Sequence, residues 1–172
     1  MTLTRTLLVP AAAVALVASG VGVGWSASAD QADRTDPADR AAAPVVVVRE
    51  LLAEDRAPRG SADRTLGLNR VTVMPGAELA SHHHPGTQIS YVESGVLTYT
   101  VETSSTAVRT GPSDDPRVVR RIAAGQTARL RAGQWIVEQP NMTHHAANRG
   151  TTPVVLYIST LFRTGTSAAI PD

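Results

Sequence analysis

Residues 76–95 read GAELASHHHPGTQISYVESG, and this stretch decides the fold. Its spacing is G-x5-H-x-H-x3-Q-x6-G. The fixed places are occupied by Gly76, His82, His84, Gln88 and Gly95. On an extended segment, side chains two residues apart point to the same side, so His82 and His84 share one face while His83 takes the other. Two neutral imidazoles side by side are a natural start for a divalent metal site.

The chain has five histidines, and all of them fall in two clusters, at 82–84 and at 144–145. A third imidazole from the second cluster would complete a three-histidine metal site. Gln88 lies four residues beyond His84, and its side-chain carbonyl could add a fourth, neutral oxygen ligand. Two simpler alternatives stay open: an exposed histidine run that binds metal adventitiously, and core histidines that are satisfied by hydrogen bonds.

A second stretch, residues 133–148, carries the other histidines and reads GQWIVEQPNMTHHAAN. Its fixed places are Gly133, Gln139, Asn141, His144 and Asn148, separated by five, one, two and three residues. Together the two stretches resemble the two conserved motifs of the cupin superfamily, and the first stretch matches in every spacing. The resemblance extends over residues 71–161.

This resemblance implies a single cupin-type β-barrel or jelly roll, with one divalent metal held in the barrel interior. The implied ligands are His82, His84, Gln88 and His144. His144 is implied rather than His145 because only His144 keeps the register of the cupin motif with Gly133 and Asn148. His83 and His145 then point away from the metal.

Gln88 is the main departure from the cupin pattern, because cupins usually have a glutamate at this place. An amide leaves a bound divalent ion with one more unit of positive charge and weakens its binding. The sequence therefore predicts that Gln88→Glu tightens metal binding. It leaves open whether Gln88 is a weak ligand or instead forms a hydrogen bond to a metal-bound water or a substrate. The other departures, Gln139 and Asn141, are mild, since Asn tolerates left-handed backbone.

Five further polar or aromatic residues lie on or beside the motif strands and could line a pocket. They are Tyr91, Glu93, Tyr99, Trp135 and Glu138. Packing or solvation is the preferred explanation for each of them. The sequence has no glycine elbow around a serine and no glycine-rich phosphate loop, so nothing supports a serine hydrolase or a nucleotide-binding site. Catalytic residues are left unassigned.

Beyond Val45 the chain consists of short runs of β-branched residues separated by Gly, Pro, Asn or Asp, with no helical period. The pattern predicts an all-β domain with strands at 45–52, 66–74, 88–92, 96–102, 118–122, 127–131, 134–137 and 154–161. Short, evenly spaced strands favour a closed or two-sheet architecture, because open edges would otherwise stay unpaired. Gly76, Gly95 and Gly133 are expected in turns that need unusual backbone angles.

The amino-terminal part is expected to lie outside this domain. Residues 1–29 have one early arginine, an apolar run and the small-residue pattern Ala27-Ser28-Ala29, which is typical of a cleaved signal peptide. The alternative is an uncleaved N-terminal anchor. The sequence predicts a flexible linker at residues 30–44, the folded domain at 45–162 and a frayed tail at 163–172. The expected location is therefore secreted or extracellular, with no stable membrane span after signal cleavage.

Composition excludes several functions. The chain has 172 residues, with 16 basic residues against 15 acidic ones and a formal net charge of +1. Every basic residue is an arginine and none forms a basic stripe, so nucleic acid is not an expected partner. Without cysteine, there can be no disulfide, thiolate nucleophile or zinc finger.

By the resemblance, the expected cofactor is one divalent transition metal: Fe, Mn, Ni, Cu or Zn. The expected partner is a small-molecule ligand or substrate that chelates the metal. Cupins include dioxygenases, lyases and isomerases, so the resemblance implies a metal-dependent enzyme, for example a dioxygenase-like one. The alternatives are a non-catalytic binding module and a purely structural metal site. A homodimer formed through edge strands, with a contribution from Val45–Val48, is a further hypothesis.

Overall fold

The computed structural model describes residues 46–172, which form twelve β-strands and no α-helix. The strands are β1 (Val47–Arg56), β2 (Arg64–Val73), β3 (Glu78–His83), β4 (Gly86–Ser94), β5 (Val96–Val101), β6 (Ser105–Thr110), β7 (Arg117–Ala123), β8 (Thr127–Arg131), β9 (Gln134–Glu138), β10 (His144–Ala147), β11 (Val154–Arg163) and β12 (Ile170–Pro171). The prediction of an all-β fold is confirmed. The predicted signal peptide (1–29) and linker (30–44) lie outside the described residues.

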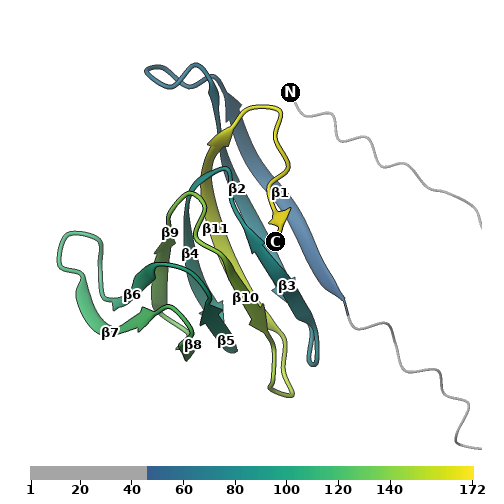
Figure 1. Cartoon of the computed structure of the whole chain (residues 1–172), viewed down its shortest axis with the longest axis vertical. Helices are drawn as coiled ribbons and strands as arrows, with labels where there is room; N and C mark the ends of the chain where they lie inside the picture. Colours follow the sequence, from purple (N-terminus) through teal and green to yellow (C-terminus); the bar gives the residue numbers. More distant parts are fainter. Residues whose placement is uncertain (1–45) are drawn as a thin grey trace, which may run out of the picture. The chain divides into compact units, whose positions relative to one another are not determined.

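The strands form two antiparallel sheets (Figure 1). The larger sheet has the order β1-β2-β11-β4-β9-β6-β7, and the smaller has the order β12-β3-β10-β5-β8. Most neighbours in these sheets are distant in sequence; β11, for example, lies between β2 and β4. The two stretches that carry the histidines meet in the smaller sheet, where β3 pairs with β10.

The core lies between the two sheets and comes from both of them. The larger sheet contributes Val71, Val92 and Leu156, and the smaller contributes Leu97, Tyr99 and Leu130. Strand β4 shows the two-residue period that produces this core, since Gln88, Ser90 and Val92 are buried while Ile89 and Tyr91 are exposed. Because the polar Gln88 faces inward, the wall of the core already contains part of a site.

Four strands, β3, β6, β10 and β12, were not among the predicted ones. Their sequences are rich in Ser, Thr, His and Ala, or are very short, and so carry a weak strand signal. β10 is only four residues long, yet it pairs with β3 on one side and with β5 on the other. Tertiary pairing therefore decides these strands.

The carboxyl-terminal residues differ from the expected frayed tail. Ile170 and Pro171 form β12 and pair with His83 and His82 of β3. In Figure 1 this segment, drawn in yellow, folds back beside β3. The last residues of the chain are thereby placed next to the histidine run.

The three motif glycines all adopt left-handed backbone angles, with φ of 80° at Gly76, 81° at Gly95 and 79° at Gly133. A side chain is disfavoured in this conformation, so glycine is required for conformational reasons. The turn at Asn141 also has a positive φ, 62°, which Asn tolerates.

Strand β1 forms one edge of the larger sheet. A dimer formed through this edge stays a prediction. Within residues 46–172, no helix is long and apolar enough to cross a membrane.

Candidate metal centre

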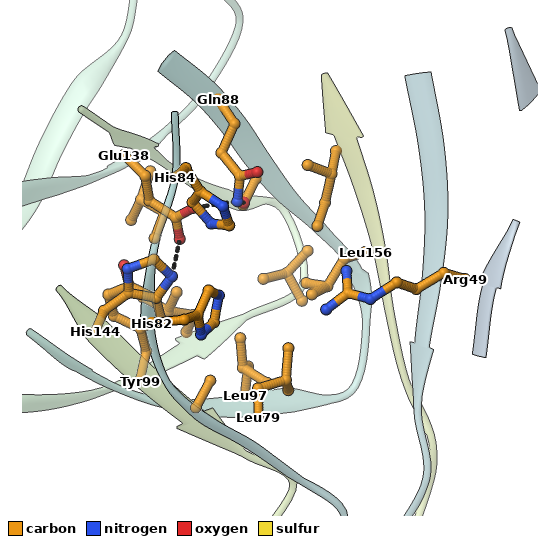
Figure 2. A pocket seen from close by; sticks show the side chains of 16 residues that line it. Arg49, Leu79, His82, His84, Gln88, Leu97, Tyr99, Glu138, His144 and Leu156 are labelled. Carbon is orange, nitrogen blue, oxygen red and sulfur yellow. Dashed lines mark hydrogen bonds and ion pairs between the residues drawn. The ribbon is translucent and has the colours of Figure 1, made fainter. Parts of the chain in front are cut away.

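Three histidines converge between the two sheets (Figure 2). His82 lies in β3, His84 directly follows this strand, and His144 begins β10, where it is the cross-strand partner of His82. Their exposed fractions are 8%, 6% and 3%. One ring nitrogen of each lies within 4.8 Å of the corresponding nitrogens of the other two. The chain thus brings together three of the four residues that the sequence predicted as metal ligands.

A backbone carbonyl fixes the orientation of each imidazole. The Nδ1 atoms of His82, His84 and His144 lie 2.7, 2.5 and 2.9 Å from the carbonyl oxygens of Ala80, Ala168 and Met142. A carbonyl can only accept, so each Nδ1 carries a proton, and Nε2 is the ring nitrogen left for another partner. This tautomer is the one that a histidine needs to bind a metal through Nε2.

The donor atoms fit a divalent transition metal. The Nε2 atom of His84 is buried and has no hydrogen-bond partner within residues 46–172, which is costly for a polar atom unless something binds it. Burial also lowers the pKa of His82, with the neighbouring His144 and His84 acting in the same direction, so its ring stays neutral near pH 7. Neutral imidazoles with free lone pairs are suitable ligands for Fe, Ni, Cu or Zn ions.

The other two histidines lie on the opposite faces of their strands. His83 Nδ1 lies 2.9 Å from Oδ1 of Asp172, and His145 Nδ1 lies 2.5 Å from Oε1 of Glu102. Each therefore has a carboxylate partner away from the cluster. Neither of them contributes an atom to the three-histidine group.

Gln88 lies on the same wall of the core but its contacts involve its amide nitrogen. Nε2 of Gln88 donates to Ser90 Oγ at 3.3 Å and to Oε2 of Glu138. Gln88 and Glu138 are direct cross-strand partners in β4 and β9. The fourth predicted residue is thus brought to the site, together with a carboxylate for which the sequence had favoured packing or solvation.

Glu138 is the site residue that sequence reasoning undervalued. It is 2% exposed, and its two carboxylate oxygens lie 3.4 Å from His84 Nε2 and 3.7 Å from His144 Nε2. Burial opposes its ionisation, but the summed interactions with His84, His144 and Tyr99 outweigh this effect and hold the pKa of Glu138 below its usual value. The site therefore holds an ionised carboxylate.

Tyr99 also lies in the site, since its ring stacks on that of His144 at a centroid distance of 5.2 Å. Burial, together with the charge of Glu138, raises the pKa of Tyr99 well above its usual value, so the phenol keeps its proton. The remaining pocket candidates lie elsewhere. Tyr91 and Trp135 are cross-strand partners that line a groove with the exposed Ile89, while Glu93 is exposed.

The cluster borders a cavity of about 40 Å³. A cavity needs about 10–15 Å³ of this kind of volume to hold one water molecule, so there is room for an ion and a few small groups. Apolar residues from both sheets line most of it, including Leu79, Leu97 and Leu156.

Arg49 extends from β1 and directs its guanidinium toward this space (Figure 2). Within residues 46–172, this guanidinium has no ion-pair or hydrogen-bond partner.

Comparison with known proteins finds a family match over part of the chain. Residues 69–113 match the family model described as a cupin domain. The matched residues begin in β2 and include the whole first motif with His82, His84 and Gln88, so the resemblance to cupins is confirmed. The second motif, with His144, lies beyond the match and reaches the site through the pairing of β10 with β3.

Several solved structures are similar to this chain. A cupin 2 domain-containing protein from Halorhodospira halophila has a TM-score of 0.49 and 11% identity, covering 78% of this chain and 75% of that one. A conserved protein of unknown function from Streptococcus pyogenes, SPY1581, has a TM-score of 0.47 and 15% identity, with coverages of 72% and 80%. Oxalate decarboxylase from Bacillus subtilis, a protein with Mn(II) centres, has a TM-score of 0.42 and 23% identity, with coverages of 69% and 26%. No curated protein matches the sequence.

Proposed function

We propose that this cupin domain binds one divalent transition metal and acts as a metal-dependent enzyme on a small, anionic, chelating substrate. One observation carries the proposal: three buried imidazoles direct free Nε2 atoms at one point because backbone carbonyls hold all three Nδ1 protons. When bound, the metal would supply Lewis acidity and, if it is iron, manganese or copper, redox chemistry with dioxygen. On the pattern of residues 1–29, we further propose that the protein is exported.

The surrounding side chains determine which substrates fit. The small cavity, lined largely by apolar side chains, favours a compact ligand. Arg49 offers at this cavity a guanidinium that has no partner among residues 46–172, and a carboxylate is the group that a guanidinium binds best, through two parallel hydrogen bonds. Partial burial lowers the pKa of Arg49, an effect that the charge of Glu138 opposes, but a guanidinium remains protonated at neutral pH. Tyr99 supplies a protonated hydroxyl beside the histidines.

Metal analysis of the protein purified without added metal tests the first half of the proposal. We expect close to one equivalent of a transition metal, and iron, manganese or copper would direct the search to oxygen-consuming or other redox reactions. Zinc would direct the search to non-redox reactions. A protein that takes up no divalent metal in its folded state would contradict the proposal.

Binding of oxalate, used as a compact chelating dianion, tests the second half. In the metal-loaded protein, Arg49→Gln is expected to weaken oxalate binding by about 10- to 100-fold, the loss that accompanies removal of a charged hydrogen bond. Arg70→Gln is the matched control, because Arg70 lies on the neighbouring strand and pairs with the exposed Glu50 instead. If the wild type and both variants bind oxalate with equal affinity, Arg49 does not contact the ligand. Oxalate that binds without turnover of any chelating substrate tested would favour the alternative, a non-catalytic binding module.

Deletion of residues 167–172 is expected to weaken metal binding by about 10-fold or more, because it removes the Ala168 carbonyl that orients His84. Isothermal titration with Zn²⁺ would measure the loss. Deletion of Asp172 alone is the control, since it breaks only the contact with His83 on the opposite face. An unchanged affinity after the longer deletion would show that His84 is oriented without the tail.

A further inference from the structure

Within residues 46–172, Glu138 is a buried carboxylate that forms no ion pair with an arginine. Among the residues that line the 40 Å³ cavity it is the single acid, and its ion-pair partners within residues 46–172 are His84 and His144. A buried carboxylate needs a compensating positive charge, because desolvation of an isolated anion is expensive. Both histidines direct Nε2 at this carboxylate while a backbone carbonyl holds Nδ1, so the carboxylate faces the same nitrogen atoms that would bind a metal.

A metal ion at the point between these atoms would supply the charge, and the distances suit one. Two ligand atoms that are each about 2.1 Å from the same ion lie about 3.0 Å apart at a right angle and about 3.4 Å apart at the tetrahedral angle. The distances from Glu138 to His84 Nε2 and His144 Nε2 are 3.4 and 3.7 Å. The first distance, from Oε2, fits the tetrahedral angle, whereas the second, from Oε1, corresponds to a wider angle and is longer than a hydrogen bond.

Gln88 faces Glu138 in the orientation of a donor. An ionised carboxylate can only accept hydrogen bonds, so the part of the Gln88 amide that meets it must be the NH2 group. The same nitrogen is directed at Ser90. The nitrogen of this amide has no lone pair that could bind a metal. Through this contact Gln88 is a hydrogen-bond partner of the Glu138 carboxylate.

We infer that Glu138, and not Gln88, supplies the oxygen ligand of the metal centre, and that Gln88 positions it. The inference rests on the proposed function, since it assigns a fourth ligand to the proposed site. The carboxylate that other cupins carry at the place of Gln88 is, in this chain, carried by the cross-strand neighbour of that place. One negative charge is thereby restored to the ligand set. If the inference holds, Gln88→Glu places two carboxylates side by side and does not tighten metal binding.

The test is a titration with Co²⁺ alone, followed by competition with a chelator and by the visible spectrum of bound cobalt. Glu138→Gln is expected to weaken Co²⁺ binding by about 10- to 100-fold and to change the spectrum, since an oxygen ligand is lost. Glu93→Gln, which alters an exposed glutamate on the same strand as Gln88, is the control and should bind as the wild type does. Binding by Glu138→Gln within twofold of the wild type, with an unchanged spectrum, would overturn the inference.

The exchanged double variant Gln88→Glu/Glu138→Gln keeps one amide and one carboxylate in the pair, and so provides a test even if Glu138→Gln fails to fold. It carries as many carboxylates as the wild type and is expected to bind Co²⁺ no more tightly. A tenfold gain in affinity over the wild type would overturn the inference, because it would mean that position 88 had been a neutral ligand all along. If the wild type itself binds no Co²⁺, the proposed function fails; if the wild type and Glu138→Gln bind equally, only the inference fails.

Discussion

His144→Ala is expected to abolish stoichiometric binding of a divalent metal, with a loss of affinity of at least about 100-fold. The side chain is 3% exposed, is oriented by the Met142 carbonyl and is one of the three imidazoles of the cluster. His82→Ala should have the same effect, since His82 is its cross-strand partner in the cluster. Equilibrium dialysis with metal analysis would measure the stoichiometry.

His145→Ala and His83→Ala are the matched controls, because each lies next to a ligand in sequence but on the opposite face of its strand. His145 contacts Glu102, and His83 contacts Asp172. Both variants should retain one equivalent of metal. Equal losses in the His144 and His145 variants would mean that the face assignment of β10 is incorrect.

Gly95→Ala is expected to destabilise the fold by about 2–5 kcal/mol, which is a large part of the stability of an ordinary domain. Two effects add at this position. The backbone has φ of 81°, which L side chains rarely adopt. A Cβ atom would also lie 2.7 Å from the carbonyl oxygen of Pro153 and 2.9 Å from Cα of Val154, and both contacts involve backbone that cannot easily move. Urea denaturation monitored by circular dichroism would measure the loss.

Gly133→Ala separates the two effects. Its backbone angle is nearly the same, with φ of 79°, but a Cβ atom there would meet nothing within 4 Å. Only the conformational cost remains, about 1 kcal/mol. If the two variants lose equal stability, the close approach of the chain at Pro153 is not what makes Gly95 necessary.

The histidine faces could be predicted from sequence because they depend on local geometry alone. Along an extended segment the alternation of side chains is fixed, so the order His82-His83-His84 is enough to separate two inward imidazoles from one outward imidazole. The positions of the turn glycines could be predicted for the same reason, since a left-handed backbone angle is a property of single residues.

Glu138 could not be assigned in this way. The strand that carries it reads Gln134-Trp-Ile-Val-Glu138, and its three consecutive apolar residues give no alternation from which to tell the inner face from the outer one. Its role depends on the register that sets Glu138 opposite Gln88, fifty residues away in the sequence. A single acid in an otherwise apolar strand was the one available signal.

The sequence by itself determined the all-β class, the turn positions and which histidines share a face, because these follow from the two-residue period of a strand and from the backbone limits of each residue. By contrast, the placement of Glu138 and Arg49 at the histidine cluster, and of the Ala168 carbonyl at His84, depends on the folded chain. These relations join strands that are far apart in the chain. They arise from the pairing order of the sheets and from the return of the carboxyl-terminal segment, which no local pattern encodes.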